Sequence, residues 1–232
     1  VKSFKMKSTS AAKKKTLRLM RDCGLFHFTR ALSSRMPRIL MYHSFAGAGT
    51  DSGSAVSVDE LRSHLVYLRR HYRVVRLSDI AQIMKSGALF PGPTVALTVD
   101  DGRRNFYDVF FPLLIEFAMP ATFFVVSSFI RGEDWLWTDK VLWLSEQESA
   151  EEDLRPLNLE ALFGRLNRIS PMSRNSQIDV MARRMNVSIP ASAPDKYSPC
   201  SWLELREMAD SGLIDIGSHT ATHPVLSSIS DE

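Results

Sequence analysis

The strongest constraint on the fold is an alternation of short apolar runs with helical segments along most of the chain. Each apolar run is bounded by proline, glycine or charged residues, which is typical of strands buried on both faces. Strands that alternate with helices predict parallel β-α units with right-handed connections. We therefore predict an α/β fold, with strands near residues 38–43, 73–77, 94–99, 121–126 and 213–216.

The helical segments carry start signals of their own. Ser57, Ser78 and Ser201 are expected N-caps, since serine accepts a hydrogen bond from a free backbone N–H of the first turn. A glutamate follows Ser57 and Ser201 three residues later, which predicts a capping box at each. The helix after Ser78 is expected to end at Gly87, where glycine permits a left-handed C-terminal residue.

The chain divides into three parts by composition. Residues 1–37 are predicted to be a basic N-terminal extension, and residues 38–232 a single domain. Within that domain, residues 135–200 are mostly polar and helical in pattern, which predicts a helical insertion at the rim of the fold. Trp135, Trp137 and Trp143 lie in it, and they are expected either in its core or stacked on a sugar.

Charge is distributed unevenly. The net charge is +3, but residues 1–38 hold eleven Lys or Arg and one acid, so they carry +10. Such a segment either stays solvated against the domain or contacts an anionic membrane surface, and we keep both alternatives for residues 1–37. No nucleic-acid partner is expected. Neither a signal peptide nor a transmembrane segment is recognisable, which predicts a cytoplasmic or membrane-peripheral chain.

A first polar cluster follows the apolar run at residues 94–99. Asp100, Asp101 and Gly102 come at the carboxyl end of this predicted strand, where parallel α/β folds gather their ligands. Gly102 permits a sharp turn there. The alternative is a turn in which an aspartate caps the next helix, and the doublet alone does not separate these interpretations.

A second polar cluster follows the last predicted strand. His219 and His223 are four residues apart, so both imidazoles meet on one face if the segment turns helically. Two histidines and one aspartate form a common open site for a divalent metal. The alternative is a histidine-capped turn. Because both clusters follow strands at their carboxyl ends, each strengthens the interpretation of the other.

The two clusters have the form of known sequence motifs. TVDDG at residues 98–102 and SHTATHP at residues 218–224 resemble the first two motifs of the polysaccharide deacetylase family, the NodB-homology domains of carbohydrate esterase family 4. LMYHS at 40–44 and SWLELREM at 201–208 are also similar to that family. The resemblance implies a distorted (β/α) barrel and removal of N-acetyl groups from an amino-sugar polysaccharide or its precursor.

The resemblance also implies roles for individual residues. By position in the motifs, Asp101, His219 and His223 would hold the metal, which is usually zinc, although cobalt and iron are open alternatives. Asp100 would be the catalytic base. His43, which follows the first predicted strand at the same end of the fold, is expected either to line the substrate site or to be a buried structural residue.

The chain departs from the family pattern after His223. The later motifs, which supply an arginine that orients the base and a histidine that acts as acid, are not recognisable, and about five barrel strands are counted. We therefore expect a sequence truncated at the C-terminus, with an incomplete barrel and low activity. A metal- or carbohydrate-binding protein without catalysis is the alternative function. A non-haem iron oxygenase is disfavoured, because no arginine suited to an oxo-acid is apparent.

Overall fold

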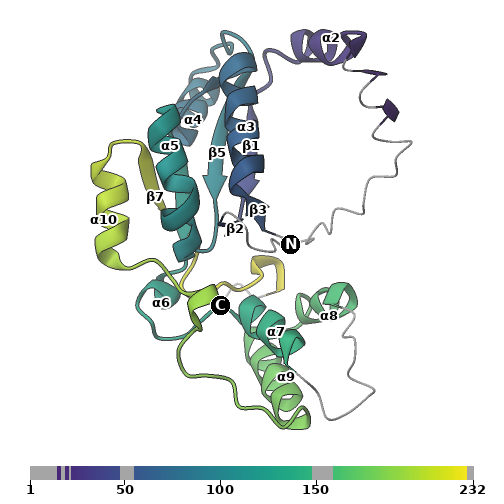
Figure 1. Ribbon diagram of the computed structural model, residues 1–232, viewed down its shortest axis with the longest axis vertical. Helices are drawn as coiled ribbons and strands as arrows, with labels where there is room; N and C mark the ends of the chain where they lie inside the picture. The colour runs from purple at the N-terminus through teal and green to yellow at the C-terminus, as the bar shows by residue number, and fades with distance from the viewer. Residues whose placement is uncertain (1–14, 17–18, 21, 48–54, 148–158, 229–232) are drawn as a thin grey trace.

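The fold was obtained as a computed structural model, which describes residues 15–16, 19–20, 22–47, 55–147 and 159–228. A parallel sheet flanked by helices forms one part, and a group of helices lies beyond the carboxyl ends of its strands (Figure 1). The strands are β1 (Arg38–Tyr42), β2 (Phe45–Ala46), β3 (Val56–Ser57), β4 (Arg73–Val74), β5 (Thr94–Val99), β6 (Ala121–Val125) and β7 (Ile214–Ser218). The helices are α2 (Leu25–Leu32), α3 (Val58–His71), α4 (Leu77–Ser86), the π-helical turn η1 (Phe106–Phe110), α5 (Phe111–Phe117), α6 (Ser127–Ile130), α7 (Trp137–Glu146), α8 (Leu159–Leu166), α9 (Pro171–Arg184), the 3₁₀ turn η3 (Asp195–Tyr197), α10 (Trp202–Asp210) and the 3₁₀ turn η4 (Leu226–Ser228).

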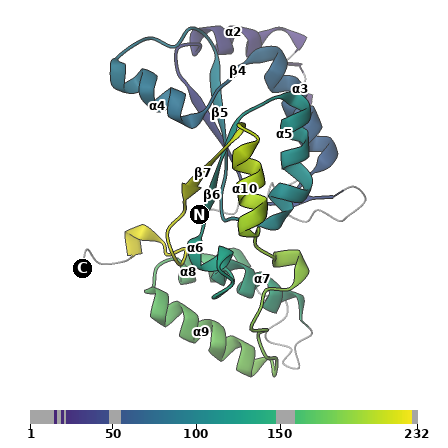
Figure 2. The same cartoon turned by 90° about the vertical axis from the view of Figure 1, so that its left-hand side faces the viewer.

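The main sheet is parallel throughout, as the alternation of strands and helices predicts. Its order is β1-β5-β6-β7, and the short β4 pairs with the start of β5. All six residues of β5 are buried, because β1 and β6 flank it and helices cover both of its faces. The carboxyl ends of β5 and β7 therefore lie at the same edge of the sheet, which Figure 2 shows above α6 and α7.

Both capping boxes are present. Ser57 accepts from the backbone N–H of Glu60, and Ser201 accepts from that of Glu204. The prediction of Ser78 as an N-cap is wrong by two residues. α4 begins after Arg76, whose N–H donates to the side chain of Asp79 at 3.2 Å, so an aspartate inside the first turn satisfies the free donor. The strand before it accordingly ends at Val74 rather than at residue 77.

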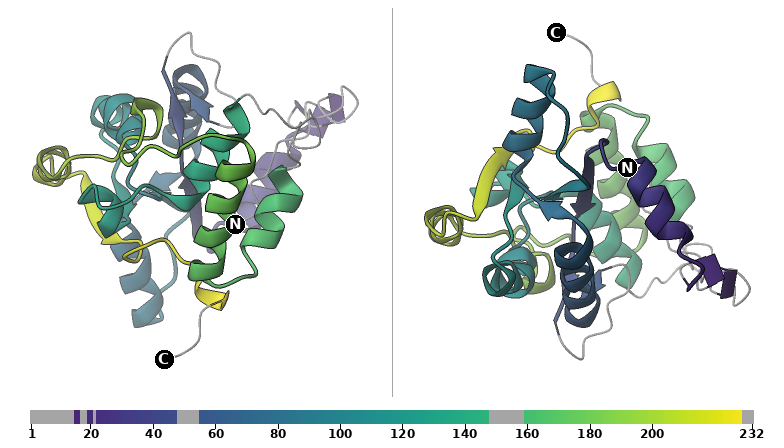
Figure 3. Two further views of the ribbon diagram at one scale, coloured as in Figure 1. Left: turned by 90° about the horizontal axis from the view of Figure 1, so that it is seen from below. Right: turned by 90° about the horizontal axis from the view of Figure 1, so that it is seen from above.

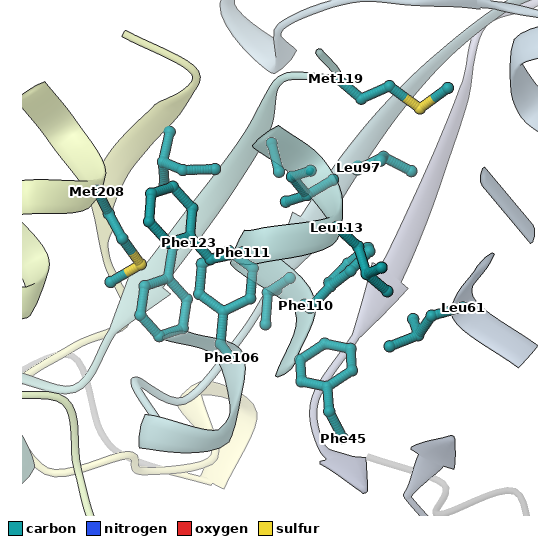
Figure 4. Packing of buried hydrophobic residues seen from close by; sticks show 14 of the residues in the cluster. Phe45, Leu61, Leu97, Phe106, Phe110, Phe111, Leu113, Met119, Phe123 and Met208 are labelled. Atoms are coloured by element: carbon teal, nitrogen blue, oxygen red, sulfur yellow. The ribbon is translucent and has the colours of Figure 1, made fainter. Parts of the chain in front are cut away.

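The hydrophobic core lies on one face of the sheet. Residues of β5 and β6 pack there against α3, η1, α5 and α10, with Phe106 and Phe123 at a ring-centroid distance of 4.3 Å (Figure 4). On the other face, Ile80 of α4 and Phe90 pack over Ala96. Alternate residues of β5 thus face opposite helical layers, which fixes the direction of the strand that carries the first polar cluster.

Helices α7, α8 and α9 pack on each other around a second apolar cluster that includes Trp137, Leu144, Leu166 and Ile178. Viewed from that side, they lie in front of the strands (Figure 3, left). Trp135 and Trp137 are buried, so the structure supports the core interpretation of these two tryptophans rather than stacking on a sugar.

The described strands do not close into a barrel; β1 and β7 form the two outer positions of an open sheet. The α/β class is confirmed, and the open sheet agrees with the expectation of an incomplete barrel. In the described part of the extension, α2 exposes Leu25, Phe28 and Leu32, whereas residues 1–14, 17–18 and 21 lie outside the described residues. None of the described helices combines the length and the apolar character needed to cross a membrane.

Candidate metal centre

The turn after β5 carries the two aspartates. The N–H of Asp100 donates to the carbonyl of Tyr42 at 3.0 Å and extends the pairing with β1 by one residue. Asp101 then has φ +85° and Gly102 has φ +94°, so the chain reverses through two left-handed residues. An aspartate at positive φ is uncommon and costs free energy, and such strain gathers at functional sites. The expected sharp turn at Gly102 is confirmed.

The two histidines follow the end of β7. The N–H of His219 donates to the carbonyl of Val125 at 2.9 Å, which anchors the loop beside β6. The spacing of the two histidines would fit a helical turn, but this segment is not helical. Thr220 and His223 have positive φ instead, and the hydroxyl of Thr220 accepts from the N–H of His223 at 3.0 Å. This tight loop brings the two imidazole centroids to 5.1 Å.

Asp101, His219 and His223 converge at one point. Oδ1 of Asp101 lies 3.8 Å from Nε2 of His219 and 3.5 Å from Nε2 of His223. One ligand atom from each residue lies within 4.8 Å of the others. Oδ1 is buried and has no hydrogen-bond partner among the described residues, which is costly unless a cation compensates it. This donor set therefore fits a divalent metal such as zinc.

The charges in the cluster favour a cation. Burial lowers the pKa of His223 to about 4, so its imidazole is neutral at physiological pH, the form that binds a metal. Burial alone would raise the pKa of Asp101, but the nearby charge of Arg103 keeps that pKa below its usual value. The cluster thus offers the carboxylate of Asp101 and the neutral imidazole of His223, which are the protonation states that metal binding requires.

Asp100 lies beside this cluster but outside it. Its Oδ2 is 3.8 Å from Nε2 of His43, and its side chain is buried but more exposed than that of Asp101. Burial raises the pKa of Asp100, and the charges of His219 and His43 oppose that shift. A carboxylate whose pKa is raised towards neutrality is a better proton acceptor. His43 is thus partly exposed beside Asp100, and its role in lining the substrate site stays a prediction.

Two residues of the centre were missed from the sequence. Arg103 donates through Nε to Oδ2 of Asp101 at 3.2 Å and through Nη1 to Oδ2 of Asp139 at 2.6 Å. No arginine near the aspartates was expected, because the later family motif that supplies an arginine to orient the base is not recognisable in this chain. The position directly after Gly102 was the only local signal for Arg103. No local signal marks Asp139, which lies in the first turn of α7.

An α/β sheet with a two-histidine, one-aspartate cluster at its strand ends defines an enzyme-like centre able to hold a divalent metal. The sequence model described as "Polysaccharide deacetylase" matches residues 89–232, more than half of the chain. The chain belongs to the polysaccharide deacetylase family.

The chain is also similar to individual proteins. Poly-beta-1,6-N-acetyl-D-glucosamine N-deacetylase of Escherichia coli (strain K12) is 34% identical over 77 residues, which are 33% of this chain and 12% of that protein. IcaB from Ammonifex degensii is similar with a TM-score of 0.48 and 22% identity, covering 79% of this chain and 52% of that one. Streptococcus pyogenes deacetylase PplD gives a TM-score of 0.48 and 18% identity, covering 83% and 60%. The chain thus spans only part of the length of each relative.

Proposed function

We propose that the protein is a metal-dependent hydrolase that removes N-acetyl groups from an amino-sugar polysaccharide. The observation that carries this proposal is the buried Oδ1 of Asp101, which has no hydrogen-bond partner in the part of the chain that the structure describes and lies near the Nε2 atoms of His219 and His223. Family membership supports the reaction. The name of the Escherichia coli relative supports an N-acetylglucosamine polymer as the substrate class.

In this proposal Asp101, His219 and His223 hold the metal, most suitably zinc. Lewis acidity is what such an ion supplies: it polarises an amide carbonyl and acidifies water. The protein has to hold the three ligand atoms at fixed positions before the substrate arrives. The buried turn at Asp101 and the tight loop at His223 meet that requirement, because both are constrained by positive φ and backbone hydrogen bonds.

Asp100 acts as the general base. Its carboxylate lies next to the cluster without being one of the three converging ligands, so it is free to accept the proton of the attacking water. The pKa of Asp100 is raised by burial, which strengthens the carboxylate as a base. His43, 3.8 Å from Asp100, lines the substrate side of the base and limits how the sugar approaches it.

The test is acetate release from a poly-N-acetylglucosamine oligosaccharide by the wild type and by Asp100→Asn. We expect the variant to lose about 10²- to 10⁴-fold in rate, because the base is removed, while its bound metal remains unchanged. Asp108→Asn is the matched control, since Asp108 is an exposed aspartate that pairs with Arg104. Metal binding without acetate release by the wild type would instead favour the non-catalytic binding protein.

A further inference from the structure

A buried chain of charged groups connects the helical insertion to the candidate metal centre. Asp139 in the first turn of α7 binds Nη1 of Arg103, and Nε of the same guanidinium binds Oδ2 of Asp101. The side chains of Arg103, Asp101 and Asp139 are 11%, 4% and 0% exposed. All three charged groups are therefore buried away from water. Burying a charged group costs much more free energy than leaving it on the surface.

Stability alone is a weak reason for this arrangement. Apolar side chains of similar volume usually replace a buried ion pair at no loss of stability, since desolvation offsets the attraction. Moreover, Oδ1 of Asp139 is buried without a hydrogen-bond partner among the described residues, so the network is incompletely satisfied. The network costs free energy to bury and lies next to the candidate metal centre. A role in that centre would explain why it is there.

The geometry shows what that role is. Arg103 occupies only Oδ2 of Asp101, and this leaves Oδ1 directed at the Nε2 atoms of His219 and His223. A guanidinium is planar and presents its donors in a fixed fork, so anchoring one side on Asp139 fixes the other side for Asp101. The orientation of the carboxylate thus depends on a residue of the insertion.

The backbone of Arg103 is also fixed. Its carbonyl accepts from the N–H of Phe106 at 3.1 Å, and Arg103 forms an isolated antiparallel bridge with Pro199. Helix α7 makes a second, separate contact with the centre: Nε1 of Trp137 donates to the carbonyl of His223 at 3.1 Å. One helix of the insertion therefore contacts both loops that carry the ligands.

We propose that Arg103 and Asp139 are positioning residues of the metal centre, and that the insertion helix α7 braces the ligand Asp101 through them. The inference rests on the proposed function, because it assumes that Asp101 binds a metal. It extends the centre beyond the three ligands and gives the insertion a part in catalysis. Groups that orient metal ligands typically contribute about 10- to 100-fold to metal affinity.

The test is zinc affinity, measured by competition with a chromophoric chelator, together with the visible spectrum of the cobalt-substituted protein. The double variant Arg103→Met/Asp139→Leu removes the two charges beyond Asp101 together, so neither Arg103 nor Asp139 is left as a buried ion without its partner, and only Asp101 loses a contact. We expect it to bind zinc about 10- to 100-fold more weakly and to show an altered cobalt spectrum. Arg104→Met is the matched control, since Arg104 is the exposed neighbour that pairs with Glu204, and it should bind zinc like the wild type.

Two conservative variants cover the case in which the double variant does not fold. Asp139→Asn keeps the shape of the side chain but removes the charge that anchors Arg103, and Arg103→Lys keeps the charge but loses the fork. Both should bind zinc more weakly than Arg104→Met. If every folded variant binds zinc within twofold of the wild type, the inference is wrong. If the wild type itself binds no zinc, the proposed function is wrong in its metal dependence.

Discussion

Oδ1 of Asp101 lies 3.5 Å from Nε2 of His223, although the two residues belong to loops that lie far apart in the sequence. Asp101 follows β5 and His223 follows β7, and β6 separates these strands in the sheet. Parallel strands place their carboxyl ends at one edge, so the sheet brings the two loops to a single point. The following predictions test the consequences of this convergence.

Metal should stabilise the protein through His219. At free zinc about 100 times the dissociation constant, binding to the folded state alone adds about 2.7 kcal/mol to the free energy of unfolding. Thermal unfolding with and without zinc measures this gain. His219→Ala should abolish it, whereas His64→Ala, on the exposed side of α3, should keep it. An equal gain in His219→Ala would show that zinc binds elsewhere.

The side chain of His43 should affect catalysis without affecting the metal. Because its Nε2 lies 3.8 Å from Oδ2 of Asp100, we expect His43→Ala to lower kcat/KM about tenfold, equivalent to about 1.4 kcal/mol of transition-state stabilisation. Steady-state acetate release and metal analysis of the same preparation measure both quantities. A loss of zinc in His43→Ala would place His43 among the ligands instead.

Two glycine substitutions should act in opposite directions. Gly102 has φ +94°, and an added Cβ would lie 3.0 Å from Cδ1 of Ile130, so Gly102→Ala should lower the free energy of unfolding by more than about 1 kcal/mol. Gly164, inside α8, has open space around its Cβ position, and Gly164→Ala should raise stability by about 0.5–1 kcal/mol. Urea unfolding measures both, and equal effects would contradict the described turn at Gly102.

The two cysteines should differ sharply in reactivity. Both are free thiols, but Cys23 is exposed and Cys200 is buried. Burial raises the pKa of Cys200 to about 12, so almost no thiolate exists there at pH 8, and the thiolate is the reactive form. Ellman's reagent at pH 8 should therefore modify one thiol per folded chain and two after unfolding. Two rapid reactions in the folded chain would disprove the burial of Cys200.

Local features of the fold were predictable because they depend on neighbouring residues. The strand Thr94–Val99 and the capping boxes at Ser57 and Ser201 have the predicted positions. Each follows from a few consecutive side chains and their hydrogen-bonding capacity. The start of α4 was misplaced, since Ser78 and Asp79 both offer a capping oxygen and only the path of the chain selects Asp79.

The backbone at the candidate site was less predictable. A four-residue spacing of His219 and His223 suggested a helical turn, whereas the structure has a loop with left-handed residues at Thr220 and His223. Helical spacing and this loop bring the rings together equally well, so the spacing alone does not distinguish them. Hydrogen bonds from Ser127 and Ser128 to Thr220 and Ala221 hold the loop, and these come from another part of the chain.

By itself, the sequence determined the parallel α/β class, the family and the identity of the residues proposed as ligands and base. These properties follow from the periodicity of apolar residues and from two short motifs, and each of these signals depends on only a few consecutive residues. Only the tertiary structure decided that Arg103 connects Asp101 to Asp139, and that α7 contacts the loops after β5 and β7. The physical reason is that a buried charge takes its partner from whatever side chain the packed fold brings within reach, and no local pattern records that choice.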